Sequence, residues 1–200
     1  MLPQPENPPL TLKLSEYSPQ ERSYLLDAAH RAILAAVRGE AWKPSPPSAH
    51  LAEPRGAFTT LHIVDRLRGC VGFVYPVKPL CTTVMETAVA AAFHDPRFLP
   101  VTEEESSRLE IEISVLSRLF RIDPKEVAIG RHGLLVSRGF QRGLLLPQVA
   151  VEHDWTREVF LDEACLKAGL SPNAWKHGAT VEAFTAEVFG NKERRAAVKA

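Results

Sequence analysis

The sequence predicts an α+β protein with a mixed or mainly antiparallel sheet and flanking helices. Apolar residues alternate with a spacing of two in residues 57–74 and 109–115, which is the period of a half-buried strand. Residues 18–39 instead repeat with the helical period. Neighbouring strands are separated by short turns, which join antiparallel pairs, whereas a doubly wound parallel sheet needs a crossover after each strand.

The first predicted helix begins at Ser18 and Glu21, which form a capping box with Pro19 at the first helical position. Its apolar stripe consists of Leu25, Leu26, Ala29, Ile33 and Val37. Gly39 is expected to end it. Residues 42–56 contain four prolines, so we expect an extended, mobile connection there.

The next elements alternate between strands and helices. Residues 57–74 are expected to form a hairpin that turns at residues 64–66. A helix opens at Lys78 and Pro79 and must stop before Pro96, because the residue before a proline disfavours helical geometry. A second capping box, Thr102 with Glu105, predicts a short helical turn.

The C-terminal half begins with the clearest strand, residues 109–115. Three elements follow: a hairpin over residues 133–147 turning through 138–143, a helix over 156–168 closing on Gly169, and a strand over 181–189. We expect a flexible tail at residues 1–14, a single domain at 15–190 and a second flexible tail at 191–200.

Composition argues against several functional classes. The chain has 24 basic and 24 acidic residues, so no long-range charge attracts nucleic acid or anionic lipid. No apolar stretch approaches membrane-spanning length, and residues 1–14 do not resemble a secretory signal. Three cysteines leave one unpaired and lack C-x-x-C spacing, which favours reduced thiols and a cytoplasmic location.

No motif in the sequence indicates a cofactor. Phosphate-binding glycine loops, HExxH and GxSxG are absent, so the cofactor stays unknown. No metal site is predicted, although a His/Asp/Cys site assembled in space stays open.

Residues 67–72, LRGCVG, form the most unusual segment. Its two glycines weaken a strand that would otherwise pack well, which usually means that something approaches the backbone closely. If the turn at residues 64–66 has three residues, His62, Arg68 and Cys70 share one face, whereas a slip of one residue moves His62 away. A guanidinium two residues along a strand lies roughly 6–7 Å from the thiol and favours a thiolate.

The sequence leaves the histidine partner of Cys70 open among His62, His94 and His132. Each candidate also has a purely structural interpretation. Free cysteine is most often a small buried hydrophobe, Arg68 an exposed strand charge, and Glu112 a solvated strand position. Asp95 and Arg97 fit a local ion pair at a helix end. Cys81 and Cys165 fall on helical apolar faces and are expected in the core.

The hexapeptide LRGCVG is similar to the LRGCIG motif of the AMME-syndrome candidate family, with Val71 in place of isoleucine. Further matches cover nearly the whole chain past Glu16: residues 92–98, 112–116, 132–134, 146–149, 165–169 and Trp175. The resemblance implies two closely packed subdomains with a cleft. At this length it points to the bacterial AmmeMemoRadiSam branch of the family, encoded beside a Memo-like protein and a radical SAM protein. Carried over by position, the family pattern marks Arg68, Gly69, Cys70, Gly72, Asp95, Arg97, Glu112 and His132.

Two functional hypotheses follow. In the first, the chain is an enzyme-like component acting on a small molecule or a protein side chain, with Cys70, His132 and Glu112 as catalytic residues. Its substrate-binding residues would be Arg68, Gly69, Gly72, Asp95, Arg97 and His62. In the second, it is a non-catalytic module whose glycine-bearing strand docks a peptide, the Memo-like protein or the radical SAM protein. Whether it is an enzyme, its substrate and its oligomeric state stay open.

Overall fold

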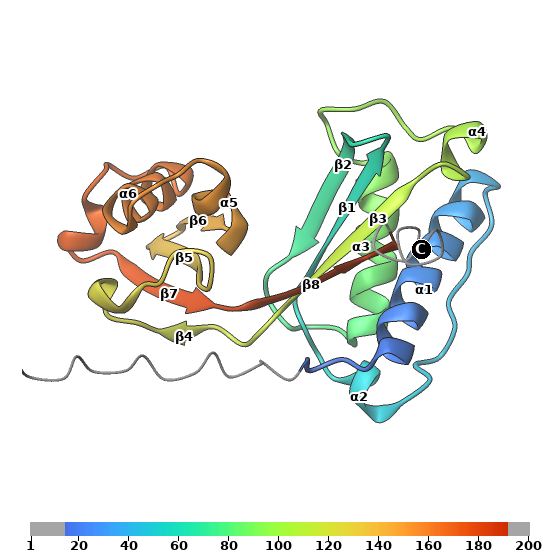
Figure 1. The fold of residues 1–200 in the computed structure, drawn as a ribbon, viewed down its shortest axis with the longest axis horizontal. Coiled ribbons are helices and arrows are strands. Elements are labelled where there is room, and N and C mark those ends of the chain that lie inside the picture. The colour runs from blue at the N-terminus through green and yellow to red at the C-terminus, as the bar shows by residue number, and fades with distance from the viewer. Residues whose placement is uncertain (1–14, 192–200) are drawn as a thin grey trace, which may run out of the picture.

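The computed structural model describes residues 15–191, which form two lobes (Figure 1). The first lobe contains a four-stranded sheet in the order β2-β1-β3-β8. Its strands are β1 (Ala57–Ile63), β2 (Arg66–Phe73), β3 (Glu110–Leu116) and β8 (Ala186–Gly190). Its helices are α1 (Pro19–Val37), α2 (Ala49–Ala52), α3 (Leu80–Phe93) and α4 (Glu103–Ser106).

The second lobe is built on another four-stranded sheet, in the order β4-β7-β5-β6. Its strands are β4 (Phe120–Arg121), β5 (Gly133–Arg138), β6 (Gln141–Leu145) and β7 (Thr180–Phe184). Two α-helices, α5 (Pro147–Glu152) and α6 (Arg157–Lys167), and two 3₁₀ turns, η1 (Pro124–Glu126) and η2 (Ala174–Lys176), complete it. All these strand pairs are antiparallel, so the predicted α+β class with a mixed or mainly antiparallel sheet and flanking helices is confirmed, and the strands are divided between two sheets.

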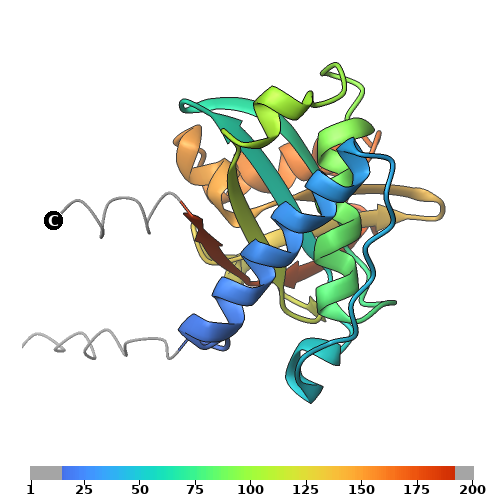
Figure 2. The same cartoon turned by 90° about the vertical axis from the view of Figure 1, so that its right-hand side faces the viewer.

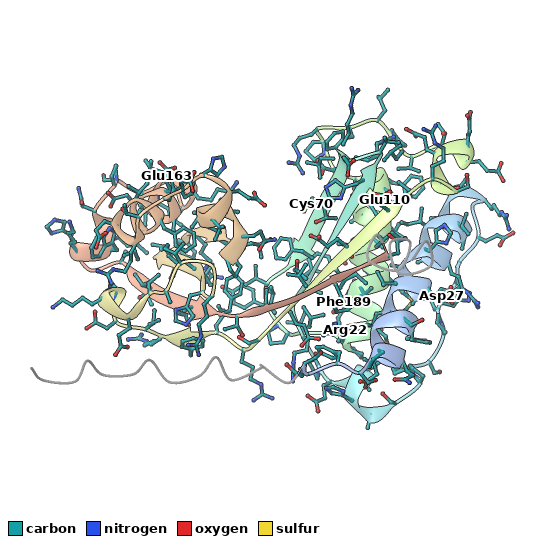
Figure 3. The ribbon with its side chains drawn as sticks, in the orientation of Figure 1. Arg22, Asp27, Cys70, Glu110, Glu163 and Phe189 are labelled. Atoms are coloured by element: carbon teal, nitrogen blue, oxygen red, sulfur yellow. The ribbon has the colours of Figure 1, made fainter. Side chains whose placement is uncertain are left out.

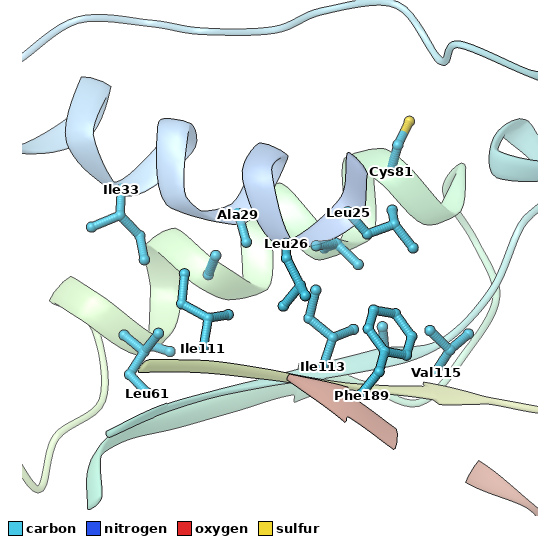
Figure 4. Close-up of a cluster of buried hydrophobic side chains, with 14 of the residues drawn as sticks. Leu25, Leu26, Ala29, Ile33, Leu61, Cys81, Ile111, Ile113, Val115 and Phe189 are labelled. Atoms are coloured by element: carbon cyan, nitrogen blue, oxygen red, sulfur yellow. The ribbon is translucent and has the colours of Figure 1, made fainter. Parts of the chain in front are cut away.

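The core of the first lobe lies between its sheet and helices α1 and α3 (Figure 4). Odd-numbered strand residues such as Leu61, Ile113 and Phe189 point into it and meet Leu25 and Ile33 of α1. Because side chains alternate along a strand, the even-numbered residues point the other way.

The two helices cover only one side of the first sheet. Figure 2 shows α1 and α3 in front of the sheet and the second lobe behind it. The even-numbered side, here named the open face, is therefore turned toward the second lobe. Its residues are Phe58, Thr60, His62, Cys70, Gly72, Glu110, Glu112, Ser114, Leu116, Ala186, Val188 and Gly190.

Helix α1 begins and ends as predicted. The Ser18 hydroxyl accepts the Glu21 N–H at 3.2 Å, and the Glu21 carboxylate accepts the Ser18 N–H at 2.9 Å. Gly39 follows the helix with φ +72°, a left-handed conformation that glycine adopts at little cost. The predicted helices over 156–168 and before Pro96 are also present, as α6 and α3.

The predicted three-residue turn at residues 64–66 is wrong. Ile63 pairs with Arg66, so Val64 and Asp65 alone make the turn, both with positive φ. The register then shifts between Leu61 and His62. This bulge inserts one extra residue into β2, a feature that alternation of apolar residues does not encode.

Further elements differ from the sequence prediction. The strand expected over residues 181–189 is two strands, β7 and β8, which belong to different sheets and meet at Thr185. The hairpin expected to turn through 138–143 turns more tightly, because Arg138 pairs with Gln141. Helices α2 and α5 were not expected, because each spans fewer than two full turns and shows little periodicity.

The two lobes are linked where β3 leaves the first sheet and β8 enters it. The Ser117 N–H donates to the Thr185 carbonyl at 2.8 Å, and the Thr185 N–H donates to the Ser117 hydroxyl at 2.9 Å. The predicted tails, 1–14 and 191–200, lie outside the described residues except for Asn191. Its side-chain oxygen accepts the Ile111 N–H at 2.9 Å, so this residue belongs to the sheet edge.

Candidate functional site

Cys70 lies on the open face of the first sheet, half-buried, in edge strand β2. Figure 3 labels it on the side of the first lobe that is turned toward the second lobe. The Thr60 hydroxyl, on the adjacent strand, donates a hydrogen bond to the Cys70 sulfur at 3.3 Å. The sulfur is therefore not enclosed by aliphatic side chains alone.

Glu112 belongs to the same row of the sheet. Thr60 pairs with Cys70 on one side and with Glu112 on the other. Two strand spacings put the Cα atoms of Cys70 and Glu112 roughly 10 Å apart, with the Thr60 side chain between them. The open face thus carries a thiol, a hydroxyl and a carboxylate in one line.

His62 lies one row away from this line. The regular pairing of β1 with β3 sets His62 opposite Glu110 and keeps it on the open face. It is therefore a diagonal neighbour of Cys70, at a distance of about 7–8 Å between backbone positions. The bulge in β2 sets Leu67, not Arg68, opposite His62.

Asp95 and Arg97 lie at the outer edge of β2, beside Cys70. The buried Asp95 carboxylate accepts the Cys70 N–H at 2.9 Å and two bonds from the Arg97 guanidinium, at 2.7 and 2.9 Å. These charge-assisted bonds, above all those from Arg97, hold the pKa of Asp95 well below its usual range. Asp95 in turn raises the pKa of Arg97, and a charge on Cys70 acts in the same direction.

Arg68 is held away from the thiol by another carboxylate. Its guanidinium donates two bonds to Glu105, both at 3.0 Å, and further bonds to the carbonyls of Leu99 and Pro100. The Arg68 bonds, with the Thr102 N–H, lower the pKa of Glu105 to about 2. Arg68 therefore links the loop after α3 to β2, and the Glu105 carboxylate balances its positive charge.

The two glycines of the hexapeptide have packing partners within the protein. A Cβ at position 69 would lie 2.1 Å from the Ala91 carbonyl oxygen. The close approach of helix α3 to β2 therefore requires glycine at this position. A Cβ at position 72 would lie 2.2 Å from the Phe58 ring, which covers this glycine on the open face.

The other two histidine candidates lie elsewhere. His132 is buried in the second lobe, directly before β5, with its ring edge-on to Phe120. Its Nδ1 accepts the Ala128 N–H at 3.2 Å, which puts the proton of the neutral ring on Nε2. His94 follows α3 and lines a groove with Trp42 and Met85 on the helical side of the first lobe.

Sequence reasoning missed Thr60 and Glu105. Thr60 could have been identified from the sequence. The predicted register pairs odd-numbered residues with odd-numbered residues, and it therefore already sets Thr60 opposite Cys70. Glu105 was known only as a helix cap, and its pairing with Arg68 across 37 residues has no local signal.

Cys81 and Cys165 are buried in the two cores, as predicted. Burial raises the pKa of the Cys165 thiol. Among residues 15–191, no group of three His, Cys, Asp or Glu side chains is arranged to hold a metal ion. Within the same part of the chain, no helix is long and apolar enough to cross a bilayer.

Comparison with known proteins identifies the family. The AMMECR1 family model matches residues 26–189. The chain belongs to the AMMECR1 family. Protein MK0488 of Methanopyrus kandleri is 42% identical over 192 residues, covering 90% of this chain and 93% of that protein. Protein MJ0810 of Methanocaldococcus jannaschii is 45% identical over 156 residues, covering 73% and 78%.

A solved structure has a similar fold. The crystal structure of uncharacterized protein PH0010 from Pyrococcus horikoshii superposes with a TM-score of 0.78 at 40% identity, covering 84% of this chain and 89% of that chain. The family assignment and the α+β fold are therefore shown, and both agree with the resemblance that the hexapeptide suggested.

Proposed function

We propose that this AMMECR1 protein is an enzyme-like component that uses Cys70 as a nucleophile toward an electrophilic carbon of a small molecule or a protein side chain. The observation that supports it most directly is the Thr60 hydroxyl, which donates to the Cys70 sulfur on the open face. A hydrogen bond donated to sulfur favours its charged form, and the thiolate is the nucleophilic form.

Glu112 is one candidate to take up the thiol proton, because it shares the open face and the row of Cys70 and Thr60. His132 lies in the second lobe, and its Nδ1 already accepts a backbone N–H. His62, on the same face, is the second candidate. The Arg97 guanidinium lies 3.5 Å from the Cys70 carbonyl oxygen. It would bind an anionic group of the substrate only weakly, because the Asp95 carboxylate balances its positive charge. The proposal includes a cytoplasmic location, because a reducing compartment keeps a lone thiol reactive.

The test is the rate of Cys70 alkylation by iodoacetamide at pH 7, resolved from Cys81 and Cys165 by peptide mass spectrometry. Cys70 in the folded protein should react faster than Cys70 in the urea-unfolded chain, although folding half-buries it. Thr60→Val should slow the reaction several-fold, and Thr60→Ser, which keeps the hydroxyl, should preserve it. A folded-state rate below the unfolded rate, unchanged by Thr60→Val, would refute nucleophilic activation.

The second candidate function is a binding module for another protein, in the setting of the AmmeMemoRadiSam system. The observation that favours it is the exposed apolar run at the end of edge strand β2: Phe73, Tyr75 and Val77 are 40%, 43% and 74% exposed. An edge strand flanked by exposed apolar side chains suits strand addition by a partner such as the Memo-like or radical SAM protein.

Two variants separate the two candidate functions. A binding module predicts that Phe73→Asp abolishes recovery of a Memo-like or radical SAM partner in pull-downs from the native source, while Cys70→Ser retains it. If Cys70 is instead a catalytic nucleophile, Cys70→Ser should abolish the biological activity and Phe73→Asp should retain it. Failure to recover either partner with the unaltered protein would argue strongly against the module.

A further inference from the structure

A small pocket lies between the two lobes, where α5 approaches β8. Its volume is about 240 Å³, and its apolar lining includes Pro147 and Val151 of the second lobe with Ala186 and Val188 of the first. Val151 and Val188 are 54% and 42% exposed. Each lobe therefore contributes a half-exposed valine to one shared apolar hollow.

The local structure keeps this pocket open. Pro147 and Ala150 are buried and anchor α5 to the second lobe, which leaves Val151 pointing away from that core. Gly130, at the rim, adopts φ +76°, and a Cβ there would lie 3.2 Å from a Val151 methyl group. A larger residue at position 130 would be strained and would narrow the pocket.

The strand register gives the position of the pocket relative to Cys70. Val188 pairs with Ser114, Ser114 with Phe58, and Phe58 with Gly72, which is the row next to that of Cys70. Val188 and Cys70 thus lie on the same side of the sheet, with the buried Ser114 and the half-buried Phe58 between them. Three strand spacings and one row of the sheet put them roughly 16 Å apart.

We propose that this pocket is a subsite that binds the apolar end of an elongated small-molecule substrate whose electrophilic carbon reaches Cys70. The inference rests on the proposed function of Cys70. Pockets that enclose a whole small ligand are typically about 300–1,000 Å³, so a volume of about 240 Å³ suits one aliphatic or aromatic group rather than a complete molecule. The substrate class is therefore a molecule with an apolar group about 16 Å from its reactive carbon.

Maleimides test the subsite directly, because a thiol adds across their C=C bond. The sulfur–carbon bond forms, the thiol proton moves to the neighbouring carbon, and nothing leaves. We compare N-methylmaleimide with a maleimide that carries a phenyl group on a flexible linker of about 16 Å, the span estimated from the sheet. Both rates at Cys70 are divided by the rates of the same reagents with glutathione.

The tailed reagent should label Cys70 at least tenfold faster than N-methylmaleimide and with saturation. Val151→Asp and Val188→Asp should each remove this preference and leave the N-methylmaleimide rate unchanged. Val159→Asp is the matched control, since Val159 is a 39% exposed valine of α6 that does not line the pocket, and it should keep the preference.

Equal normalised rates for the two reagents would overturn the subsite, as would a preference that survives both Val151→Asp and Val188→Asp. The two proposals fail in different ways. A Cys70 that reacts slowly with iodoacetamide refutes nucleophilic activation, whereas the ratio of the two maleimide rates reports the subsite at any absolute reactivity.

Discussion

The Asp95 carboxylate accepts the Cys70 backbone N–H at 2.9 Å, on the side of β2 that pairs with no other strand of residues 15–191. Arg97 completes the arrangement by approaching the Cys70 carbonyl oxygen at 3.5 Å. The pair thus bonds the outward-facing backbone N–H and C=O of one residue, Cys70, at the edge of the sheet. The cysteine is held in position from both sides, by Asp95 through its backbone and by Thr60 through its sulfur.

Asp95→Asn should lower the free energy of unfolding by about 2–3 kcal/mol at pH 7, because a buried carboxylate with several charged or backbone donors is lost. Urea denaturation measures this difference. Because the pKa of Asp95 is depressed in the folded state, its contribution is present above the unfolded pKa of about 3.9 and declines as the pH falls below it. The difference between the two proteins should therefore shrink in acid.

Asp27→Asn is the control for this change. Asp27 forms an exposed i,i+4 pair with Arg31, so its loss should change stability by less than about 0.5 kcal/mol. An Asp95→Asn variant as stable as Asp27→Asn would show that the edge arrangement contributes nothing.

Glu105→Gln should weaken the attachment of the α3–β3 loop to β2. The Arg68 and Thr102 bonds lower the pKa of Glu105 from 4.5 to about 2, so its stabilisation is present above pH 4.5 and is lost as the pH falls toward 2. Allowing for partial solvent exposure, we expect a loss of about 1–2 kcal/mol at pH 7. Unfolding curves between pH 2 and 7 should show a smaller acid dependence in the variant.

Glu104→Gln, one residue earlier in α4, is the control, because no Arg68 bond involves Glu104. Its stability should follow the unaltered protein throughout that pH range. An equal acid dependence in Glu105→Gln and the unaltered protein would contradict the assigned origin of the effect.

The local elements of this fold were predictable from the sequence, and their long-range partners were not. The capping box of Ser18, the helix stop before Pro96 and the alternation around Ile111 are short-range signals. The division of residues 181–189 between two sheets is not, because no glycine, proline or other turn signal interrupts the segment at Thr185.

The candidate site shows the same limit. The hexapeptide identified Cys70 as a candidate, and the predicted hairpin register identified the side of the sheet on which it lies. That register is observed from Ala57 to Leu61. The bulge at Arg68, the loop bonds of Arg68 and the burial of His132 in another lobe depend on tertiary contacts. A strand pattern carries no information on where a long side chain finds its partner.

Gly69→Ala and Gly72→Ala should differ in cost. At position 69 the added methyl group meets the backbone carbonyl of Ala91, so α3 must move, and we expect a loss of about 2–3 kcal/mol. At position 72 it meets only the Phe58 ring, which can rotate away, so the loss should stay below about 1.5 kcal/mol. Thermal or urea unfolding of both variants checks the order. Equal costs would mean that the close approach of α3 to β2 is not what requires glycine at position 69.

Val64→Asn should stabilise the protein. Val64 is the first residue of the two-residue turn between β1 and β2, with φ +49°, and its side chain is 69% exposed. A β-branched residue is strained in the left-handed region, whereas asparagine is among the residues preferred at this turn position. Removing the strain should raise the free energy of unfolding by about 1 kcal/mol. Val77→Asn is the control, because Val77 is 74% exposed and is not among the residues with positive φ. Urea unfolding should show a gain for Val64→Asn alone. An equal change in both variants would assign the effect to the exposed amide side chain instead of to the backbone conformation.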